Sequence, residues 1–187
     1  MQFRSGSFAL TLLDEPTYSL GSSDNLRNYD RQFCFADEYR PSSICAVVCN
    51  EQDKEEHSCI LLASGGRTAV HEHSAVIVNR SAFVAVGDRV CSLSLPSLDL
   101  HWATRVDSAT CFGIHYSPKF NCLVSHGELE IARLSLDGEI IWTVGGRDIF
   151  SESFRLFGEL IEAVDFNREV YRIDIANGQQ SGGSQWN

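Results

Sequence analysis

The chain has 187 residues, 43% of them hydrophobic and 21% charged, and its 25 acidic and 15 basic residues give a formal net charge of −10. This composition is typical of a folded, single-domain globular protein and argues against a disordered or fibrous chain. Lysine occurs only at Lys54 and Lys119, and the sequence has no cluster of basic residues. Binding to a nucleic-acid backbone or to an anionic membrane is therefore electrostatically opposed.

The N-terminal stretch does not have the features of an export signal. Its apolar segment, Phe8–Leu13, is shorter than the hydrophobic region of a signal peptide and runs directly into Asp14. No apolar run approaches the roughly 18 residues that a membrane-spanning helix needs. The seven cysteines are odd in number, and most lie inside apolar runs, as expected for free thiols buried in a core. We therefore expect a cytoplasmic protein.

The chain divides into three parts of one domain. Residues 1–43 do not fit the repeat described below and are expected to cap an edge of the domain. Within them, the stretch Asp24–Arg31 is the best candidate for a helix, although it is short and polar enough to be a loop instead. Residues 44–178 form the repeat-containing body. Residues 179–187 are rich in glycine, serine and glutamine and are expected to be a flexible tail.

Short apolar runs punctuated by turn residues fill the body of the chain and predict β-strands joined by hairpins. The predicted strands are Ile44–Cys49, Cys59–Ala63, Ala75–Val78, Ala82–Val86, Val90–Leu95, Cys122–Ser125, Glu130–Leu136 and Glu169–Ile175. Turn sequences such as Gly87-Asp88, Asp137-Gly138 and Asn177-Gly178 separate them. The pattern predicts an all-β fold.

An internal repeat runs through the second half of the sequence. Leu93, Leu134 and Ile173 each begin an alternating apolar pair, and they recur at separations of 41 and 39 residues. A four-stranded propeller blade has a length of roughly 40 residues. Because side chains alternate along a strand, each repeat presents an apolar face that only stacking against a neighbour can bury.

The segment Leu134-Ser-Leu-Asp-Gly138-Glu-Ile-Ile-Trp142 resembles the repeat of the PQQ-like and WD40-like β-propellers. The resemblance covers about residues 75–180, and it implies propeller-like antiparallel sheets, each made by one repeat. The three repeats and a weaker unit around Ile44–Val78 amount to about four blades, which form either a small ring or a partial propeller. Trp102 and Trp142 are expected to pack between neighbouring blades. No quinone-binding constellation is present, so no cofactor is expected.

His71 and His73 are candidate metal ligands, since residues two apart on a strand project from one face. A third ligand would have to come from His115, His126 or a carboxylate. The alternative is that these are loop or surface histidines without a metal, because a site depends on the number and geometry of its ligands.

The cysteines are assigned to packing. Cys45 and Cys49 lie on one face of a predicted strand, and no second pair at zinc-binding spacing accompanies them. Cys111 and Cys122 flank a predicted hairpin and are expected to be cross-strand neighbours that remain reduced.

No catalytic residue is assigned, since the sequence has neither a Gly-x-Ser-x-Gly motif nor a phosphate-binding loop. The leading hypothesis is a non-enzymatic interaction module that binds another, basic protein, as an acidic inhibitor or immunity-like protein does. One alternative is a metal-dependent hydrolase or lyase that uses His71 and His73. A second alternative is a structural module that self-associates into a homo-oligomer.

Overall fold

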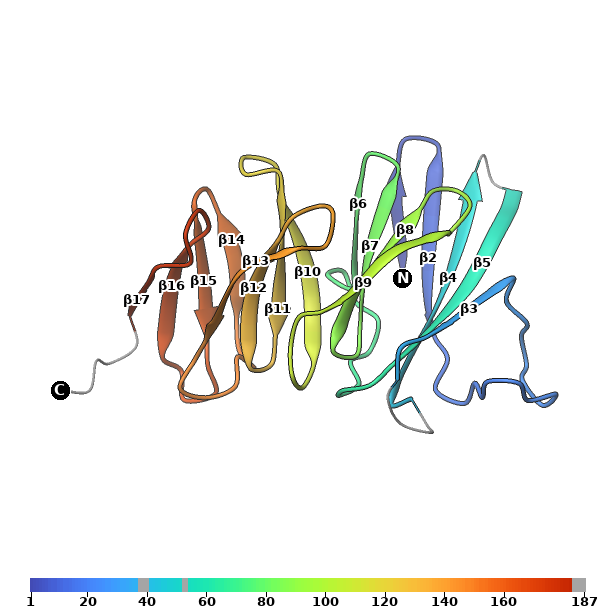
Figure 1. Ribbon diagram of the computed structural model, residues 1–187, viewed down its shortest axis with the longest axis horizontal. Coiled ribbons are helices and arrows are strands. Elements are labelled where there is room, and N and C mark those ends of the chain that lie inside the picture. Colours follow the sequence, from blue (N-terminus) through green and yellow to red (C-terminus); the bar gives the residue numbers. More distant parts are fainter. Residues whose placement is uncertain (37–40, 52–53, 183–187) are drawn as a thin grey trace.

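A computed structural model of the chain describes residues 1–36, 41–51 and 54–182. Within these ranges every regular element is a β-strand, and the strands form four sheets that follow one another along the chain (Figure 1). No helix in the described segments is long and apolar enough to cross a membrane. The predicted all-β fold class is confirmed.

The first sheet has five strands in the order β1-β2-β4-β5-β3, all antiparallel except that β3 runs parallel to β5. Its strands are β1 (Gln2–Ser5), β2 (Phe8–Asp14), β3 (Arg31–Cys34), β4 (Ser43–Glu51) and β5 (Lys54–Ala63). Residues 1–43 therefore contribute three strands to this sheet. The helix considered for Asp24–Arg31 does not form: residues 24–30 are loop and Arg31 begins β3.

Each of the other three sheets is a four-stranded antiparallel meander made by consecutive strands. The second sheet comprises β6 (Ala75–Val78), β7 (Ser81–Val86), β8 (Arg89–Ser94) and β9 (Leu100–Arg105). The third comprises β10 (Cys111–Ser117), β11 (Cys122–Gly127), β12 (Glu130–Leu134) and β13 (Ile140–Gly145). The fourth comprises β14 (Phe154–Phe157), β15 (Leu160–Val164), β16 (Val170–Asp174) and β17 (Gln180–Gly182).

The sequence repeat matches these sheets. Leu93, Leu134 and Ile173 all lie on the third strand of their sheet and are fully buried. The weaker unit expected at Ile44–Val78 is divided differently, because Ala75–Val78 is the first strand of the second sheet. The first sheet takes its remaining strands from the N-terminal segment, whose alternating Phe8, Leu10 and Leu12 supply an apolar face.

The beginning of the predicted tail is also ordered differently from our expectation. Residues Gln180–Gly182 form β17, which pairs antiparallel with β16. The turn at Gly178, where φ is +72°, brings the chain back beside β16, and backbone hydrogen bonds then hold a segment whose own side chains are small and polar. Residues 183–187 lie outside the described residues.

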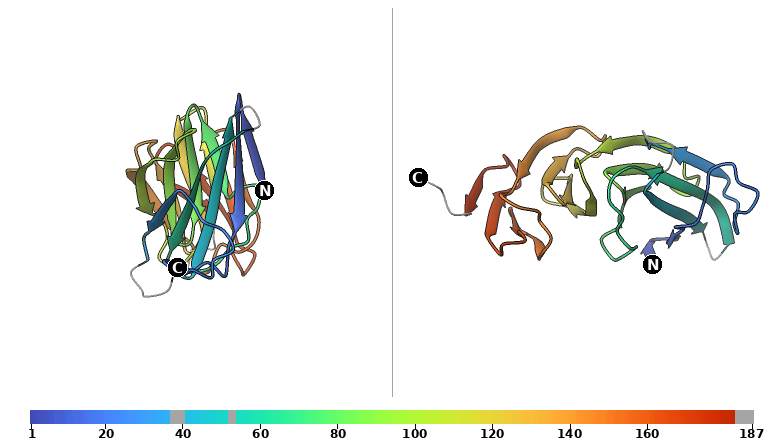
Figure 2. Two further views of the ribbon diagram at one scale, coloured as in Figure 1. Left: turned by 90° about the vertical axis from the view of Figure 1, so that its right-hand side faces the viewer. Right: turned by 90° about the horizontal axis from the view of Figure 1, so that it is seen from below.

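The sheets stack face to face in an open arc (Figure 2, right). Three apolar clusters fill the successive interfaces: Leu10, Leu61 and Leu93 contribute to the first, Phe83 and Leu123 to the second. Contacts of β6 with both β1 and β10 place these first strands side by side along the concave edge. The outer strands β9 and β13 lie on the convex edge (Figure 2, right).

A tryptophan on an outer strand covers a turn of the next sheet. Trp102 lies over Gly138, and its indole Nε1–H donates to the Leu136 carbonyl oxygen at 3.0 Å. Trp142 repeats the arrangement one sheet further on, lying over Gly178 and donating to the Ile175 carbonyl oxygen at 3.0 Å. The expected packing of both tryptophans between neighbouring blades is confirmed.

The outer faces of the first and fourth sheets differ in polarity. The outer face of the first sheet is apolar at Ile60 and Leu62, and the segment between β2 and β3 covers it with Tyr18 and Tyr29. The outer face of the fourth sheet is polar across its centre. The residues in register across its four strands are Arg155, Glu162, Arg172 and Ser181.

The corresponding row of the third sheet is much less polar and faces the fourth sheet. That row consists of His115, Val124, Arg133 and Trp142. Another sheet stacked on the fourth would have to bury Glu162 and Arg172, which form an ion pair at 3.3 Å. Burial of such a pair carries a large desolvation cost, so this central row disfavours apolar stacking. The exposed Phe157 and Val170 make the rest of the same face more apolar.

We predict that Gly138→Ala destabilises the fold much more than Gly158→Ala. Both glycines have positive φ, +87° and +61°, which costs an L-residue about 1–2 kcal/mol. A Cβ at position 138 would also lie 2.5 Å from Trp102 Cδ2, whereas one at 158 meets nothing within 4 Å. Displacing the indole should lower the free energy of unfolding by about 2 kcal/mol or more beyond the backbone cost, as overpacking of a well-packed region does.

Urea unfolding followed by far-ultraviolet circular dichroism measures both free energies. Equal losses for Gly138→Ala and Gly158→Ala would show that the indole contact contributes nothing beyond the backbone term.

Candidate functional site

A cleft lined by aromatic and histidine rings opens on the concave edge. It consists of two adjoining cavities of about 310 and 620 Å³ that share His73, His115 and Phe154. The smaller cavity is also lined by His71, Phe112, Gly113, His126, Ser151 and Glu152. The larger is also lined by Arg155, Leu156, Phe157 and Glu162.

Four of these rings form a continuous stack. The ring centroids of His73 and His115 are 4.5 Å apart, those of His115 and Phe154 are 4.7 Å apart, and those of Phe154 and His126 are 4.4 Å apart. His73 precedes β6 of the second sheet, His115 and His126 belong to the third sheet, and Phe154 begins the fourth. The stack therefore joins three sheets at their inner edges.

Gly113 allows the loop that carries His73 to approach β10. A Cβ at position 113 would lie 2.9 Å from the Cβ of His73. The absence of a side chain lets the Ile114 N–H donate to the His73 carbonyl oxygen at 2.8 Å. The same loop is fixed by His71, whose backbone N–H donates to Ser74 Oγ at 2.9 Å.

Both ring nitrogens of His71 are engaged. Nε2 lies 2.7 Å from the Phe112 carbonyl oxygen, and Nδ1 accepts the His73 backbone N–H at 3.2 Å. Because a carbonyl oxygen only accepts, Nε2 carries the proton in this arrangement. The neutral ring thus holds the loop against β10.

His115 and His126 are uncharged at neutral pH. Burial, reinforced by His73, His126 and His71, lowers the pKa of His115 to about 3. Burial also lowers the pKa of His126 to about 4, although Nε2 of His126 bonds the Phe150 carbonyl oxygen at 2.9 Å and opposes the shift. His115 Nε2 is buried without a hydrogen-bond partner, which is consistent with a ring held by stacking rather than by polar contacts.

Carboxylates lie at the rim of the cleft. Glu152 is exposed where it lines the smaller cavity, and it forms no ion pair with any described residue. Glu72 is also exposed and lies 3.7 Å from His73 Nε2. In the larger cavity Glu162 is paired with Arg172. The smaller cavity therefore combines the buried, uncharged rings of His115 and His126 with carboxylates at its mouth.

The histidines predicted from the sequence meet at this site. The structure brings His71 and His73 together with both further candidates, His115 and His126. Among the described residues, however, no group of three or more His, Cys, Asp or Glu side chains has an arrangement that could hold a metal ion. His71 could bind a metal only by giving up a hydrogen bond. Metal binding at His71 and His73 stays a prediction.

Sequence reasoning missed Phe112, Phe154 and Glu152. No spacing rule connects them, because they come from two different sheets and from the loop between them. The predicted strands do not include Phe154, so the sequence carried no signal that would place this ring beside His115.

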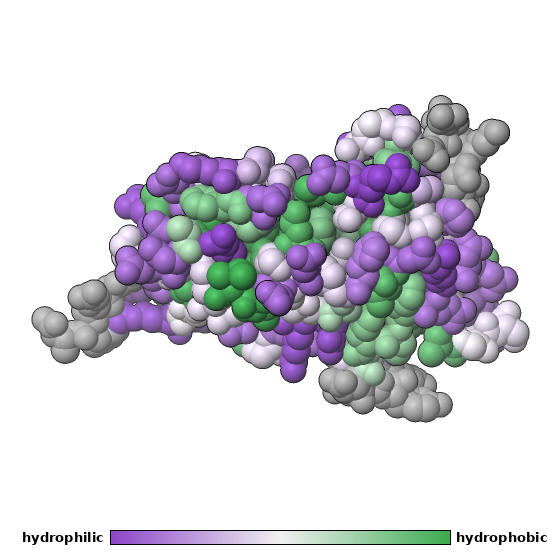
Figure 3. All heavy atoms as spheres, turned by 45° about the horizontal axis from the view of Figure 1, so that its top comes forward, coloured by the Kyte–Doolittle hydropathy of each residue, from purple (hydrophilic) through white to green (hydrophobic). Residues whose placement is uncertain are grey.

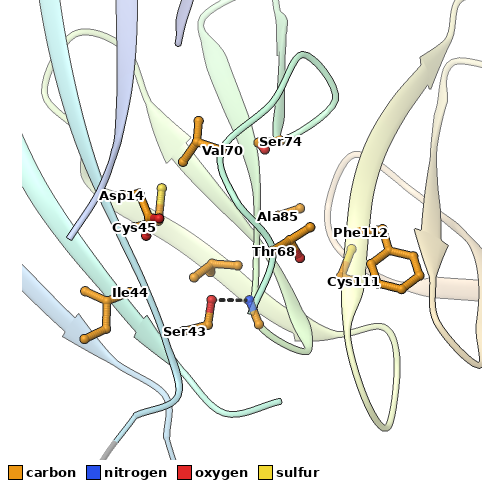
Figure 4. Close-up of a pocket in the computed structure, with 12 residues that line it drawn as sticks. Asp14, Ser43, Ile44, Cys45, Thr68, Val70, Ser74, Ala85, Cys111 and Phe112 are labelled. Atoms are coloured by element: carbon orange, nitrogen blue, oxygen red, sulfur yellow. Dashed lines mark hydrogen bonds between the residues drawn. The ribbon is translucent and has the colours of Figure 1, made fainter. Parts of the chain in front are cut away.

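A separate cavity, between the first and second sheets, is too small for a ligand. Its volume is about 20 Å³, room for about one water molecule. Figure 4 shows its lining, in which Ser43 Oγ accepts the Gly87 backbone N–H at 3.1 Å. This cavity is a small packing space, with a polar contact that ties β4 to the turn after β7.

The cysteines act as core residues. None of the seven forms a disulfide, and only Cys34 is exposed. Cys45 and Cys49 share one buried face of β4, as predicted. Burial raises the pKa of Cys45 to about 12, which keeps the thiol protonated and unreactive.

The expected cross-strand pairing of Cys111 and Cys122 is wrong. Cys111 pairs with Gly127 and Cys122 with Ser117, so the two cysteines lie at opposite ends of the hairpin. Their side chains also pack in different clusters, between different sheets. The tight turn starts only after Ser117, which makes the strands longer than the sequence suggested.

The sequence matches no family model and no curated protein. Solved structures do resemble it. Hydrazine synthase of Kuenenia stuttgartiensis aligns with a TM-score of 0.56 and 14% identity over 89% of this chain and 53% of its own. The computationally designed protein Ika8 aligns with a TM-score of 0.54 and 11% identity, over 97% and 60% of the two chains. BamB of Moraxella catarrhalis gives 0.53 and 14%, over 74% and 45%.

The fold is that of a β-propeller. The low identities show the fold alone, and this chain spans about half the length of the chains it matches. Four propeller sheets in an open arc explain why first strands converge on a concave edge, where the ring stack forms.

We predict that the fold loses stability as pH falls from about 6.5 towards 4, and that His115 accounts for part of the loss. An unfolded chain protonates histidine near pH 6.5, whereas the folded chain holds the pKa of His115 at about 3. The unfolded state therefore binds more protons in this window, so acid favours unfolding. At pH 5 one such histidine lowers the free energy of unfolding by about 2 kcal/mol relative to neutral pH.

His115→Phe keeps a ring in the stack and removes the titration. Urea unfolding at pH 7 and pH 5 should show a smaller acid-induced loss in this variant than in the wild type. His101→Gln, at an exposed position on β9 away from the cleft, serves as the control. An unchanged acid-induced loss in His115→Phe would contradict the assignment.

Proposed function

We propose that this chain is a non-enzymatic, propeller-type binding module that receives a basic protein on the concave edge of its arc. The observation that carries the proposal is the ring-lined cleft with carboxylates at its mouth, which opens where the first strands of three sheets meet. Concave, mostly apolar sites with a few polar groups are where proteins bind ligands and partner side chains.

The polar finish of the fourth sheet supports this proposal. Glu162 and Arg172 form an ion pair across the centre of its outer face, so this row is an unfavourable surface for an apolar partner, whereas the two cavities open on the concave edge. On the face shown in Figure 3, hydrophobic residues gather in separate patches among hydrophilic ones rather than in one continuous surface. Recognition through a discrete cleft fits this surface better than a broad apolar interface does.

The charge of the chain supports a basic partner. A net charge of −10 would accelerate association with a positively charged protein. The more specific version, an acidic inhibitor or immunity-like protein, rests on this charge and on the size of the chain. A cytoplasmic location is supported by the seven cysteines, none of which forms a disulfide. Membership of the PQQ-like or WD40-like repeat family is part of the same proposal.

The test is capture of companions from the native cell through a C-terminal tag, with variants that separate specific from adventitious binding. Glu152→Lys reverses a charge at the mouth of the cleft, and Glu139→Lys makes the same change in the exposed turn before β13, towards the convex edge. We expect a basic companion in equal amount with the wild type and Glu139→Lys, reduced at least about tenfold with Glu152→Lys.

A companion captured equally by all three proteins would place the contact outside the cleft and contradict the proposed binding edge.

The metal-dependent hydrolase or lyase is the second candidate, favoured by the convergence of four histidines. Titration with zinc or manganese, followed by mass spectrometry under native conditions, tests it. If the candidate is right, one ion binds per chain and His73→Ala abolishes the binding, whereas His101→Ala does not. If the ions do not bind, or bind equally to His73→Ala, the metal-dependent reading fails.

Self-association is the remaining alternative. It predicts a mass in solution that rises with protein concentration, which sedimentation or light scattering would measure. A constant monomer mass would exclude it.

A further inference from the structure

We infer that the smaller cavity of the cleft receives an arginine side chain of the basic partner, with the guanidinium group between ring walls and rim carboxylates. This inference rests on the proposed function and specifies the chemistry that the same site recognises.

The charges around the smaller cavity favour a cationic ligand. Of the described residues that line it, none is lysine or arginine, and Glu152 is its one carboxylate. Glu72, beside His73, adds a second carboxylate close to the mouth. The buried rings of His115 and His126 contribute no positive charge at neutral pH. An anionic ligand would therefore meet only negative charge, whereas a cation would find partners.

The walls of the smaller cavity favour a flat ligand. The cavity is bounded by six rings, those of His71, His73, His115, His126, Phe112 and Phe154. The His73 side chain is 49% exposed, and its ring stacks on His115, so it offers a free surface at the cavity mouth. Flat rings favour a ligand that is itself flat, and guanidinium stacks on rings while its N–H groups bond carboxylates in its plane.

The charges and the ring walls together favour arginine over lysine. An ammonium group is a compact, strongly hydrated charge, and leaving water for a ring-lined cavity costs it more. Guanidinium is more weakly hydrated and presents five N–H donors in a plane, so it can bond the Glu152 carboxylate while its face lies against a ring. The volume, about 310 Å³, lies at the small end of ligand pockets, as suits one side chain.

The experiment uses the full chain and three blocked tripeptides that differ only in the central residue: arginine, its neutral isostere citrulline, or lysine. Nuclear magnetic resonance follows the histidine ring signals and the Phe154 ring during titration. We expect the arginine peptide to shift the His73 and Phe154 signals in a saturable way, at concentrations of about 0.1–5 mM. The citrulline and lysine peptides should bind at least about fivefold more weakly.

Two variants locate the contact. Glu152→Gln should weaken arginine binding about fivefold or more, and Glu139→Gln, the same change in an exposed turn outside the cleft, should leave it unchanged. Both substitutions are at exposed positions and leave the ring stack intact. The ring signals of each free variant report whether the fold is retained.

Several results would overturn the inference. Equal affinity for the arginine and citrulline peptides would remove the role of charge, and equal affinity for arginine and lysine would remove the role of guanidinium. The absence of shifts up to about 10 mM arginine peptide would exclude the site. If capture of the companion depends on Glu152 while the arginine peptide fails, the proposed function stands and only the arginine assignment falls. If the peptide binds but capture of the companion does not depend on Glu152, the arginine site stands and the proposed binding of the companion at the cleft falls.

Discussion

The architecture depends on the contact between an outer-strand indole and the turn of the next sheet. Trp102 lies over Gly138 and Trp142 over Gly178, each with its N–H bonded to a carbonyl oxygen of that turn. A hydrogen bond fixes the height of the indole, and the bare glycine fixes how closely the next sheet approaches on the convex edge. On the concave edge no equivalent large side chain separates β6 from β10, so these strands contact each other directly. The resulting difference in spacing curves the stack into an arc and brings inner strands close enough to build the cleft.

The first interface uses different chemistry for the same purpose. The turn between β8 and β9 of the second sheet contains no glycine for a tryptophan to cover. Instead, Arg31 of β3 pairs with Asp99 of this turn at 2.9 Å. An ion pair between partly exposed side chains is worth less than a buried indole contact. The apolar cluster between these two sheets is the largest among the described residues and includes residues from β2, β4 and β5. Packing in the middle of the interface, rather than a clamp at its outer edge, therefore holds the first sheet in place.

The sequence predicted the fold where side-chain periodicity and turn chemistry agree. Leu93, Leu134 and Ile173 identified the third strand of each regular sheet, because burial on one face requires alternation and a repeat requires equal spacing. It failed where pairing is non-local. The N-terminal segment lacks the repeat, yet β2 is fixed in the first sheet by its alternating Phe8, Leu10 and Leu12 and by pairing with β4. For the cleft, the histidines were recognisable as a chemical type. Their stacking on Phe154 was not, since it depends on how three sheets are placed relative to one another.

The ring stack also explains why these four positions tolerate three histidines and one phenylalanine. Each ring is in contact with the next at 4.4–4.7 Å, so shape and stacking decide what fits. The two buried histidines of the stack are uncharged at neutral pH, because burial holds the pKa values of His115 and His126 at about 3 and 4. Burial disfavours the charge of a protonated ring at these positions, and such a charge would also oppose a cation at the mouth of the cleft. The same burial that makes the concave edge sensitive to acid thus keeps His115 and His126 from adding positive charge to the smaller cavity, whose lining includes the Glu152 carboxylate.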